Sequence, residues 1–203
     1  MGIIVQPNSL VLPQPARLSP DIDPRKERRM VAKRPLRKRS TGDPHHALRD
    51  HVRELLRGGH AHLVFKDAIA DWPVALRGAK PAGQPFTPWR LLEHIRISQW
   101  DIVEFTQSAK HVSPEWPAGY WPPGDAPPDA VAWDKSVAQV ERDLRAMEGL
   151  VTDAKMDLFG RIPHGTGQTV LREALLLADH NSYHVGQLVL LRRLLGLYRE
   201  GDG

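Results

Sequence analysis

The stretch LREALLLADHNSYHVGQLVLLRRLLG (residues 171–196) is the longest and most apolar helical pattern in the chain. Its leucines recur at steps of three and four residues, and His180 and His184 fall on the same stripe. This spacing is that of an α-helix with one buried face. We therefore predict a helix from about Gln168 to Leu197 that carries both histidines toward the protein interior.

Three earlier segments show the same helical period. They cover residues 43–71, 88–105 and 133–151. Asp43-Pro44 and Thr87-Pro88 are expected to begin the first two helices. A capping side chain accepts a hydrogen bond from a free N–H group of the first turn, and the proline that follows has no N–H group to leave unpaired. No segment has the two-residue period of a strand, so the predicted fold is all-α, an up-and-down four-helix bundle.

A long loop is predicted between the second and third helices. Residues 111–129 (HVSPEWPAGYWPPGDAPPD) contain six prolines and two tryptophans, too many prolines for a helix. Loops on a rigid scaffold often shape a binding site, so we expect Trp116, Tyr120 and Trp121 to line a pocket and to set substrate choice. Packing of a proline-stiffened surface loop is the alternative explanation.

The composition limits the chemistry that the chain can carry. It has no cysteine, which excludes disulfides, thiolate metal sites, iron–sulfur clusters and a thiol nucleophile of its own. The N-terminal residues do not follow the pattern of a secretory signal, and the most apolar stretch contains Asp179 and two histidines, which argues against a membrane span. We therefore expect a cytoplasmic protein without a membrane partner, whose metal ligands come from His, Asp or Glu.

Basic charge is concentrated near the N-terminus. The net charge is +4, but residues 1–43 contain ten Lys/Arg and four Asp/Glu. Residues 1–42 also contain six prolines and no sustained apolar period, so we predict a disordered extension ahead of a helical domain over residues 43–203. A weak electrostatic contact with nucleic acid or anionic lipid is the functional alternative to a solvated tail, but nucleic acid is not the expected partner.

His180 and His184 are four residues apart, so both imidazoles lie on one helix face and can reach a single metal ion. Two histidines four residues apart are common by chance. The pair gains support because His94 lies on the inward stripe of the 88–105 helix, where the small Ser98 one turn later leaves room for a neighbouring helix. Three histidines with an open coordination position are typical of a catalytic metal site. The alternative is that each is a core histidine bonded within the fold, and the spacing alone leaves both interpretations open.

Several neighbouring residues are further candidates. Glu173 lies on the His180 face and could be a fourth ligand or a base, or simply a surface glutamate near the helix start. His164 is interpreted as a loop residue. Side chains that could orient the ligand rings are those of Asn181, Tyr183 and Gln187. Because Asn181 stands where an H-E-x-x-H metalloprotease has its glutamate, that class of enzyme is not expected.

The motifs PWRLLEHI, GYWPP, AWDKSV and IPHGTGQT, together with the 171–196 stretch, resemble the DinB/YfiT-like family over roughly residues 44–198. Members of this family place one metal-binding histidine on the second helix and an H-x-x-x-H pair on the last long helix. The resemblance implies a DinB/YfiT-type bundle with a divalent metal on His94, His180 and His184. It identifies no catalytic residue and no general base.

The resemblance also implies a range of activities. Several family members transfer low-molecular-weight thiols or isomerise thiol adducts, with nickel, zinc or another divalent ion completed by water. We therefore expect a metal-dependent hydrolase or thiol transferase that activates water or a small thiol at zinc or nickel, with iron, cobalt or manganese as alternatives. A homodimer with a small-molecule substrate is expected, and a non-catalytic metal-binding or regulatory bundle is the alternative function.

Overall fold

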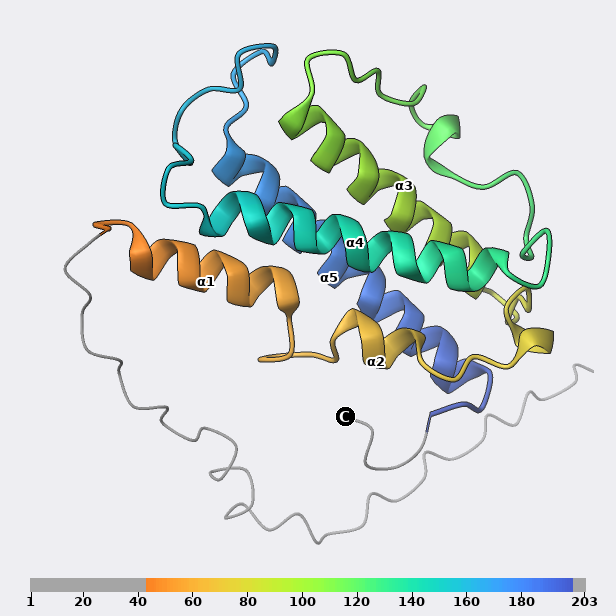
Figure 1. The fold of residues 1–203 in the computed structure, drawn as a ribbon. Helices are drawn as coiled ribbons and strands as arrows, with labels where there is room; N and C mark the ends of the chain where they lie inside the picture. Colours follow the sequence, from red (N-terminus) through yellow and green to blue (C-terminus); the bar gives the residue numbers. More distant parts are fainter. Residues whose placement is uncertain (1–42, 199–203) are drawn as a thin grey trace, which may run out of the picture. The chain divides into compact units, whose positions relative to one another are not determined.

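The computed structural model describes residues 43–198 and contains five α-helices in that range. They are α1 (His46–Arg57), α2 (Phe65–Ile69), α3 (Pro88–Gln107), α4 (Ala132–Thr152) and α5 (Val170–Leu194) (Figure 1). The described residues form no strand, and one isolated bridge joins Arg161 to Thr169. The predicted all-α class is confirmed. The predicted extension over residues 1–42 lies outside the described residues.

The single helix predicted over residues 43–71 is wrong, because this segment is broken into α1 and α2. Gly58 and Gly59 follow α1 with φ angles of 68° and 87°, values that favour glycine. The Gly58 N–H bonds to the carbonyl oxygens of Glu54 and Leu55, which closes the last turn of α1. The described residues therefore form five α-helices where the sequence predicts four.

α1 begins at His46, later than the cap predicted at Asp43. The Asp43 carboxylate nevertheless accepts the His45 N–H at 2.8 Å and pairs with Arg49 at 2.8 Å. Arg49 is buried and also donates to the Val151 carbonyl oxygen at 2.9 Å. The start of α1 is thereby tied to the end of α4.

The starts of α3 and α5 are capped by threonine. Thr87 Oγ1 accepts a hydrogen bond from the Arg90 N–H at 3.2 Å, and Thr169 Oγ1 accepts one from the Arg172 N–H at 3.1 Å. The start predicted at Thr87 is confirmed, and α5 begins close to the predicted Gln168. These caps fix the helical register of both elements and hence the directions in which their histidines point.

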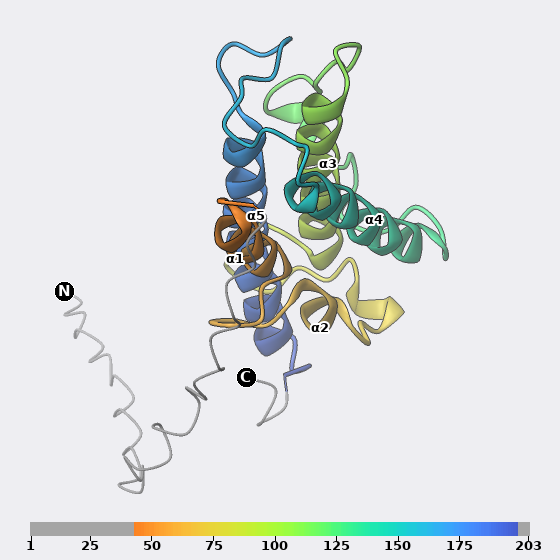
Figure 2. The ribbon, with the colours of Figure 1, turned by 60° about the vertical axis from the view of Figure 1, so that its left-hand side comes forward.

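α5 is central to the packing, since it contacts each of the other four described α-helices (Figures 1 and 2). In one core cluster Leu188 of α5 lies with Leu92 of α3 and Val140 of α4. In a second cluster Leu177 of α5 lies with Val52 of α1. Burial of each large apolar side chain contributes about 1.5–3 kcal/mol. The apolar stripe predicted from residues 171–196 is therefore the face that holds the fold together.

The loop between α3 and α4 is held against α3. It covers residues 108–131 and includes one short 3-10 helix, Ala118–Tyr120. The Tyr120 hydroxyl donates to Asp101 Oδ2 at 2.6 Å, and His111 Nε2 lies 2.7 Å from Asp101 Oδ1. Asp101 belongs to α3, so these bonds fix the proline-rich segment over that helix.

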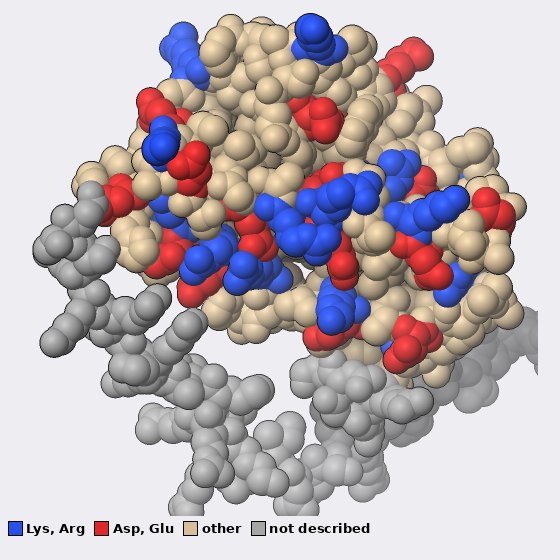
Figure 3. Space-filling model, viewed as in Figure 1, with Lys and Arg blue, Asp and Glu red and all other residues tan. Residues whose placement is uncertain are grey.

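The surface seen in Figure 3 carries basic side chains interleaved with acidic ones. Several of the described charges form ion pairs, such as Arg57 with Glu148 at 2.6 Å and Arg53 with Asp50 at 3.1 Å. Neighbouring charges of opposite sign weaken the field that would attract nucleic acid to this face. Separately, none of the helices in residues 43–198 is long and apolar enough to cross a membrane.

Candidate metal centre

His94 of α3 comes together with His180 and His184 of α5. One ring nitrogen from each lies within 4.8 Å of the others, and His180 Nε2 is 3.1 Å from His94 Nε2. His94 and His184 are each 6% exposed, and His180 is partly buried. Among residues 43–198, no other His, Asp or Glu joins this group. The structure therefore brings together the three histidines that the sequence singled out.

The His94 ring is held from two sides by the loop between α3 and α4. Its Nδ1 lies 2.9 Å from the Tyr120 carbonyl oxygen, so Nδ1 carries the proton and donates it. The Trp121 indole stacks on the same ring, with centroids 3.9 Å apart and planes inclined by 2°. These contacts leave Nε2 of His94 without a proton and directed at His180.

Gln187 orients the His184 ring. Its side-chain oxygen lies 2.7 Å from His184 Nδ1 and accepts the Nδ1 proton, so that Nε2 keeps its lone pair. Of the three side chains expected to orient the ligand rings, Gln187 makes this contact. Asn181 donates to Gln99 Oε1 at 2.6 Å, and its side chain also raises the pKa of His180 against the effect of burial. Tyr183 is 66% exposed and packs its ring against the edge of His184.

Burial keeps the three imidazoles neutral near pH 7. It lowers the pKa of His180 to about 4, and the nearby His184 and His94 add to the effect. Burial also lowers the pKa of His184 to about 4, although the bond to Gln187 opposes this shift. The pKa of His94 is likewise lowered by burial, against the effect of the Tyr120 carbonyl. Neutral imidazoles have a lone pair available for a metal ion.

The sequence of this helical region matches a known family. The family model of the DinB superfamily matches residues 61–188, a range that contains all three histidines. The chain belongs to the DinB superfamily. The family assignment made from the sequence motifs is thereby confirmed. No curated protein and no solved structure matches the chain.

Two other candidates lie outside the histidine group of this DinB-superfamily protein. Glu173 is 2% exposed and pairs with Arg172 at 2.7 Å, so the expectation of a surface glutamate is wrong. Glu173 precedes His180 by about two helical turns, or roughly 10 Å along the axis, and it is not part of the group. His164 is exposed, and its Nε2 lies 2.6 Å from the Phe105 carbonyl oxygen, as expected of a loop residue.

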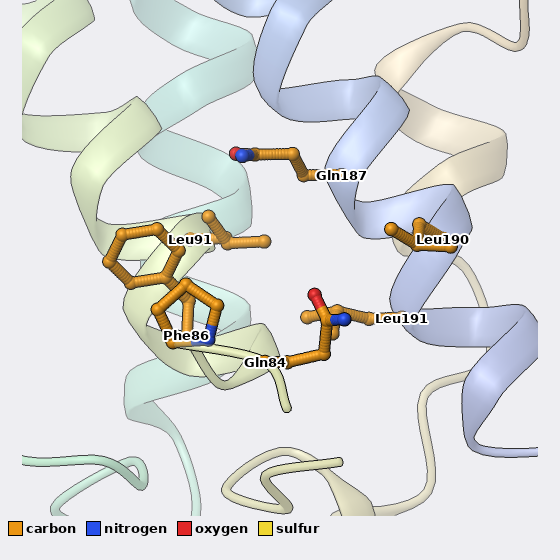
Figure 4. Close-up of a pocket in the computed structure, with 7 residues that line it drawn as sticks. Gln84, Phe86, Leu91, Gln187, Leu190 and Leu191 are labelled. Carbon is orange, nitrogen blue, oxygen red and sulfur yellow. The ribbon is translucent and has the colours of Figure 1, made fainter. Parts of the chain in front are cut away.

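A pocket of this DinB-superfamily protein lies between the start of α3, the residues before it and α5 (Figure 4). Its lining residues are Gln84, Pro85, Phe86, Leu91, Gln187, Leu190 and Leu191. The wall is mainly apolar, with two amide side chains. Gln187 belongs to both places, because the same side chain that orients His184 also lines the pocket. The pocket is therefore linked to the histidine group through Gln187.

Sequence patterns did not reveal how His94 is held. Tyr120 and Trp121 were expected to contribute their rings to a pocket wall, yet Tyr120 acts through its backbone carbonyl and Trp121 through its stack on His94. Trp116 is 75% exposed, and its ring contacts that of Tyr120. A contact through a backbone carbonyl leaves no pattern in the sequence. The aromatic residues of the 111–129 loop were therefore the available sign that this loop lies at the site.

Proposed function

We propose that His94, His180 and His184 bind one divalent metal ion and that the chain is a metal-dependent enzyme. The observation that carries this proposal is the 3.1 Å approach of His180 Nε2 to His94 Nε2 within a group of three neutral imidazoles. Two ligand nitrogens on one tetrahedral zinc ion are about 3.3 Å apart. The spacing of the two rings therefore suits a shared ion, in agreement with the metal site that the family resemblance implies.

The helices that carry the site fit the bundle of that family. In this proposal α1, α3, α4 and α5 are the four helices of a DinB/YfiT-type bundle, and α2 is an addition in the first connection. α3 and α5 both pack against α4, and α1 packs against α4 and α5. Metal sites in helical bundles are built in this way, from inward side chains on facing helices.

A divalent ion at this site would lower the pKa of a bound water or thiol, so that a nucleophile forms near neutral pH. The protein's own residues prepare the ligands, because Tyr120 and Gln187 hold the Nδ1 protons of His94 and His184. The chain has no cysteine, so any thiol must come from the substrate. The reaction type that follows is that of a hydrolase or of a low-molecular-weight thiol transferase.

The pocket beside Gln187 supports a small-molecule substrate. Phe86, Leu91 and Leu191 suit an aliphatic or aromatic group, while the amides of Gln84 and Gln187 can pair with a polar group of the substrate. For the metal, three imidazoles suit zinc or nickel, with iron, cobalt and manganese as alternatives.

Metal analysis of the purified full-length protein tests the proposal. We expect wild-type protein to retain a divalent ion and His180→Ala to lose it. His164→Ala is the matched control, because that imidazole bonds to a carbonyl oxygen outside the group. Wild-type protein that takes up neither zinc nor nickel, or unchanged metal content in His180→Ala, would contradict the proposal.

Cobalt substitution separates an enzyme from a structural metal site. A small thiol such as β-mercaptoethanol should add a sulfur-to-cobalt charge-transfer band if a coordination position is open. An unchanged spectrum would instead favour a non-catalytic metal-binding bundle. The experiment uses the wild-type protein and needs no knowledge of the substrate.

A further inference from the structure

Two buried atoms beside the candidate metal centre have no hydrogen-bond partner of good geometry. Among residues 43–198, the buried side-chain atoms in this condition are His180 Nδ1, Asn181 Oδ1 and Arg53 Nε. The first two belong to neighbouring residues of α5. Buried polar atoms in native proteins are nearly always paired, so two unpaired atoms side by side indicate a missing interaction.

The orientation of the Asn181 amide is fixed from α4. Gln99 of α3 is fully buried, and its Nε2 donates to the Val140 carbonyl oxygen at 2.5 Å. Because a carbonyl oxygen only accepts, the other end of the Gln99 amide is its oxygen, Oε1. Oε1 lies 2.6 Å from Asn181 Nδ2 and accepts its proton. The Asn181 amide therefore cannot be turned round, and its own oxygen is left to accept a different donor.

Each neutral form of the His180 ring leaves a conflict in the absence of a metal ion. The Tyr120 carbonyl holds the His94 proton on Nδ1, so His94 Nε2 presents a lone pair to His180 Nε2 at 3.1 Å. With its proton on Nε2, His180 donates to His94, but its Nδ1 and Asn181 Oδ1 then have no donor. With its proton on Nδ1, two Nε2 lone pairs face each other. A cation shared by the two Nε2 atoms removes the second conflict and leaves the Nδ1 proton to be accepted.

We propose that Asn181 is the positioning residue of His180 and that its Oδ1 accepts the His180 Nδ1 proton in the metal-bound protein. The proposal rests on the proposed function, because it requires that His180 binds the ion through Nε2. Asn181 then does for His180 what Tyr120 and Gln187 do for the other two ligands, which is to accept the Nδ1 proton.

The surroundings of Asn181 suit this role. Burial lowers the pKa of His180, and the side chain of Asn181 opposes this shift, so the amide already acts on the ring. Asn181 is 8% exposed and is held by the bond to Gln99. An acceptor that is already fixed loses little conformational entropy when it orients a ligand.

Zinc affinity of the full-length protein, measured by competition with a chromophoric chelator, is the first test. We expect Asn181→Leu, which keeps the size but has no acceptor, to bind zinc about tenfold or more weakly than wild type. Ser182→Ala is the matched control, because that hydroxyl donates to the Ala178 carbonyl oxygen within α5. Equal affinities of Asn181→Leu and wild type would overturn this proposal alone. A wild type that binds no zinc would overturn the proposed zinc site together with it.

The double variant N181L/Q99M separates this role from a structural one. Asn181→Leu alone leaves Gln99 Oε1 buried without a donor, which destabilises the fold. Replacing both amides with apolar side chains of similar size removes that unpaired atom, so the free energy of unfolding in urea should recover. Zinc affinity should stay about tenfold below that of wild type. An affinity that recovers together with stability would overturn the proposal.

Nitrogen NMR of the imidazoles locates the His180 proton. In zinc-bound wild type we expect this proton on Nδ1 and in slow exchange with water, because Asn181 accepts it. In N181L/Q99M it should exchange at least about tenfold faster, whereas the Nδ1 protons of His94 and His184 keep their acceptors and should be unchanged. A proton on His180 Nε2 in the zinc-bound protein, or equal exchange in the two proteins, would overturn the proposal.

Discussion

The rings of His94 and Trp121 lie face to face, with centroids 3.9 Å apart and planes inclined by 2°. Phe86 extends this stack, with its centroid 4.5 Å from that of Trp121. The stack joins a histidine of α3 to the loop that follows this helix. The plane of the His94 ring, and with it the direction of the Nε2 lone pair, therefore depends on a residue of that loop.

Replacing Trp121 should weaken metal binding without removing a ligand. We expect Trp121→Ala to lower metal affinity about 10- to 100-fold, the usual effect of losing a group that orients a ligand, and Trp121→Phe to retain most of it. Competition with a chromophoric chelator at pH 7 measures the affinity. Trp116→Ala is the control, because Trp116 is 75% exposed. An equal loss in both alanine variants would point to general damage to the loop.

Gln187 offers a comparison between two variants of similar size. Gln187→Met removes the oxygen that lies 2.7 Å from His184 Nδ1 and accepts its proton, whereas Gln187→Glu keeps an acceptor and adds a negative charge. We expect the methionine variant to bind the metal about tenfold more weakly and the glutamate variant to bind it at least as tightly as wild type. The same chelator competition measures both. Equal affinities in the two variants would show that this hydrogen bond has no effect on the ligand.

Much of the candidate site could be predicted because spacing along a helix determines the direction in which each side chain points. The four-residue step from His180 to His184 sets both on one face of α5, and the apolar phase of α3 turns His94 inward. The structure adds the tertiary contacts. Tyr120 bonds to His94 through its carbonyl, a group that every residue has, so the sequence could not single it out.

The break between α1 and α2 was missed for a different reason. The strong stop at Trp72-Pro73 favours a single helix up to that point, although a glycine pair lies inside the segment. Gly58 and Gly59 adopt positive φ, which ends a helix even where helix-forming residues resume nearby. The burial of Glu173 was missed because exposure is the common state of glutamate.

Gly58 itself is a test of this explanation. Its φ of 68° and ψ of −158° are strained for any residue with a Cβ, and a Cβ would lie 3.3 Å from the His62 ring. We expect Gly58→Ala to lower the free energy of unfolding by about 1–3 kcal/mol, as measured by urea denaturation. Gly149→Ala, in α4 with open space around it, is the control and should be neutral or stabilising. Similar effects in both variants would contradict the argument from backbone conformation.

The metal-free protein should lose stability on mild acidification. Histidine in an unfolded chain has a pKa of about 6.5, whereas burial lowers the pKa of His180 and of His184 to about 4 in the folded protein. Between these two pKa values the unfolded state binds more protons than the folded state. The free energy of unfolding therefore falls as the pH drops from about 6.5 toward 4. Above pH 6.5 it does not depend on these two histidines. Urea denaturation at pH 7.5, 6.5 and 5.5 after chelator treatment measures the effect. The double variant H180L/H184L should show a smaller fall, and an equal fall in both proteins would count against buried neutral imidazoles.

Tyr120 should stabilise the loop through its hydroxyl and the metal centre through its carbonyl. The hydroxyl donates to Asp101 Oδ2 at 2.6 Å, and burial, together with this bond, raises the pKa of Tyr120 to about 12. We expect Tyr120→Phe to lower the free energy of unfolding by about 1 kcal/mol and to remove the last tyrosine ionisation from an ultraviolet titration at alkaline pH.

The two roles of Tyr120 can be separated because phenylalanine keeps the backbone carbonyl that bonds to His94. Metal affinity in Tyr120→Phe should therefore fall much less than in Trp121→Ala, although both variants alter the same loop. Tyr198→Phe, at the end of the described chain, is the control and should change neither the free energy of unfolding nor the metal affinity. A loss of metal as large as that of Trp121→Ala would mean that the hydroxyl bond to Asp101, and not the stack, sets the position of the loop over His94.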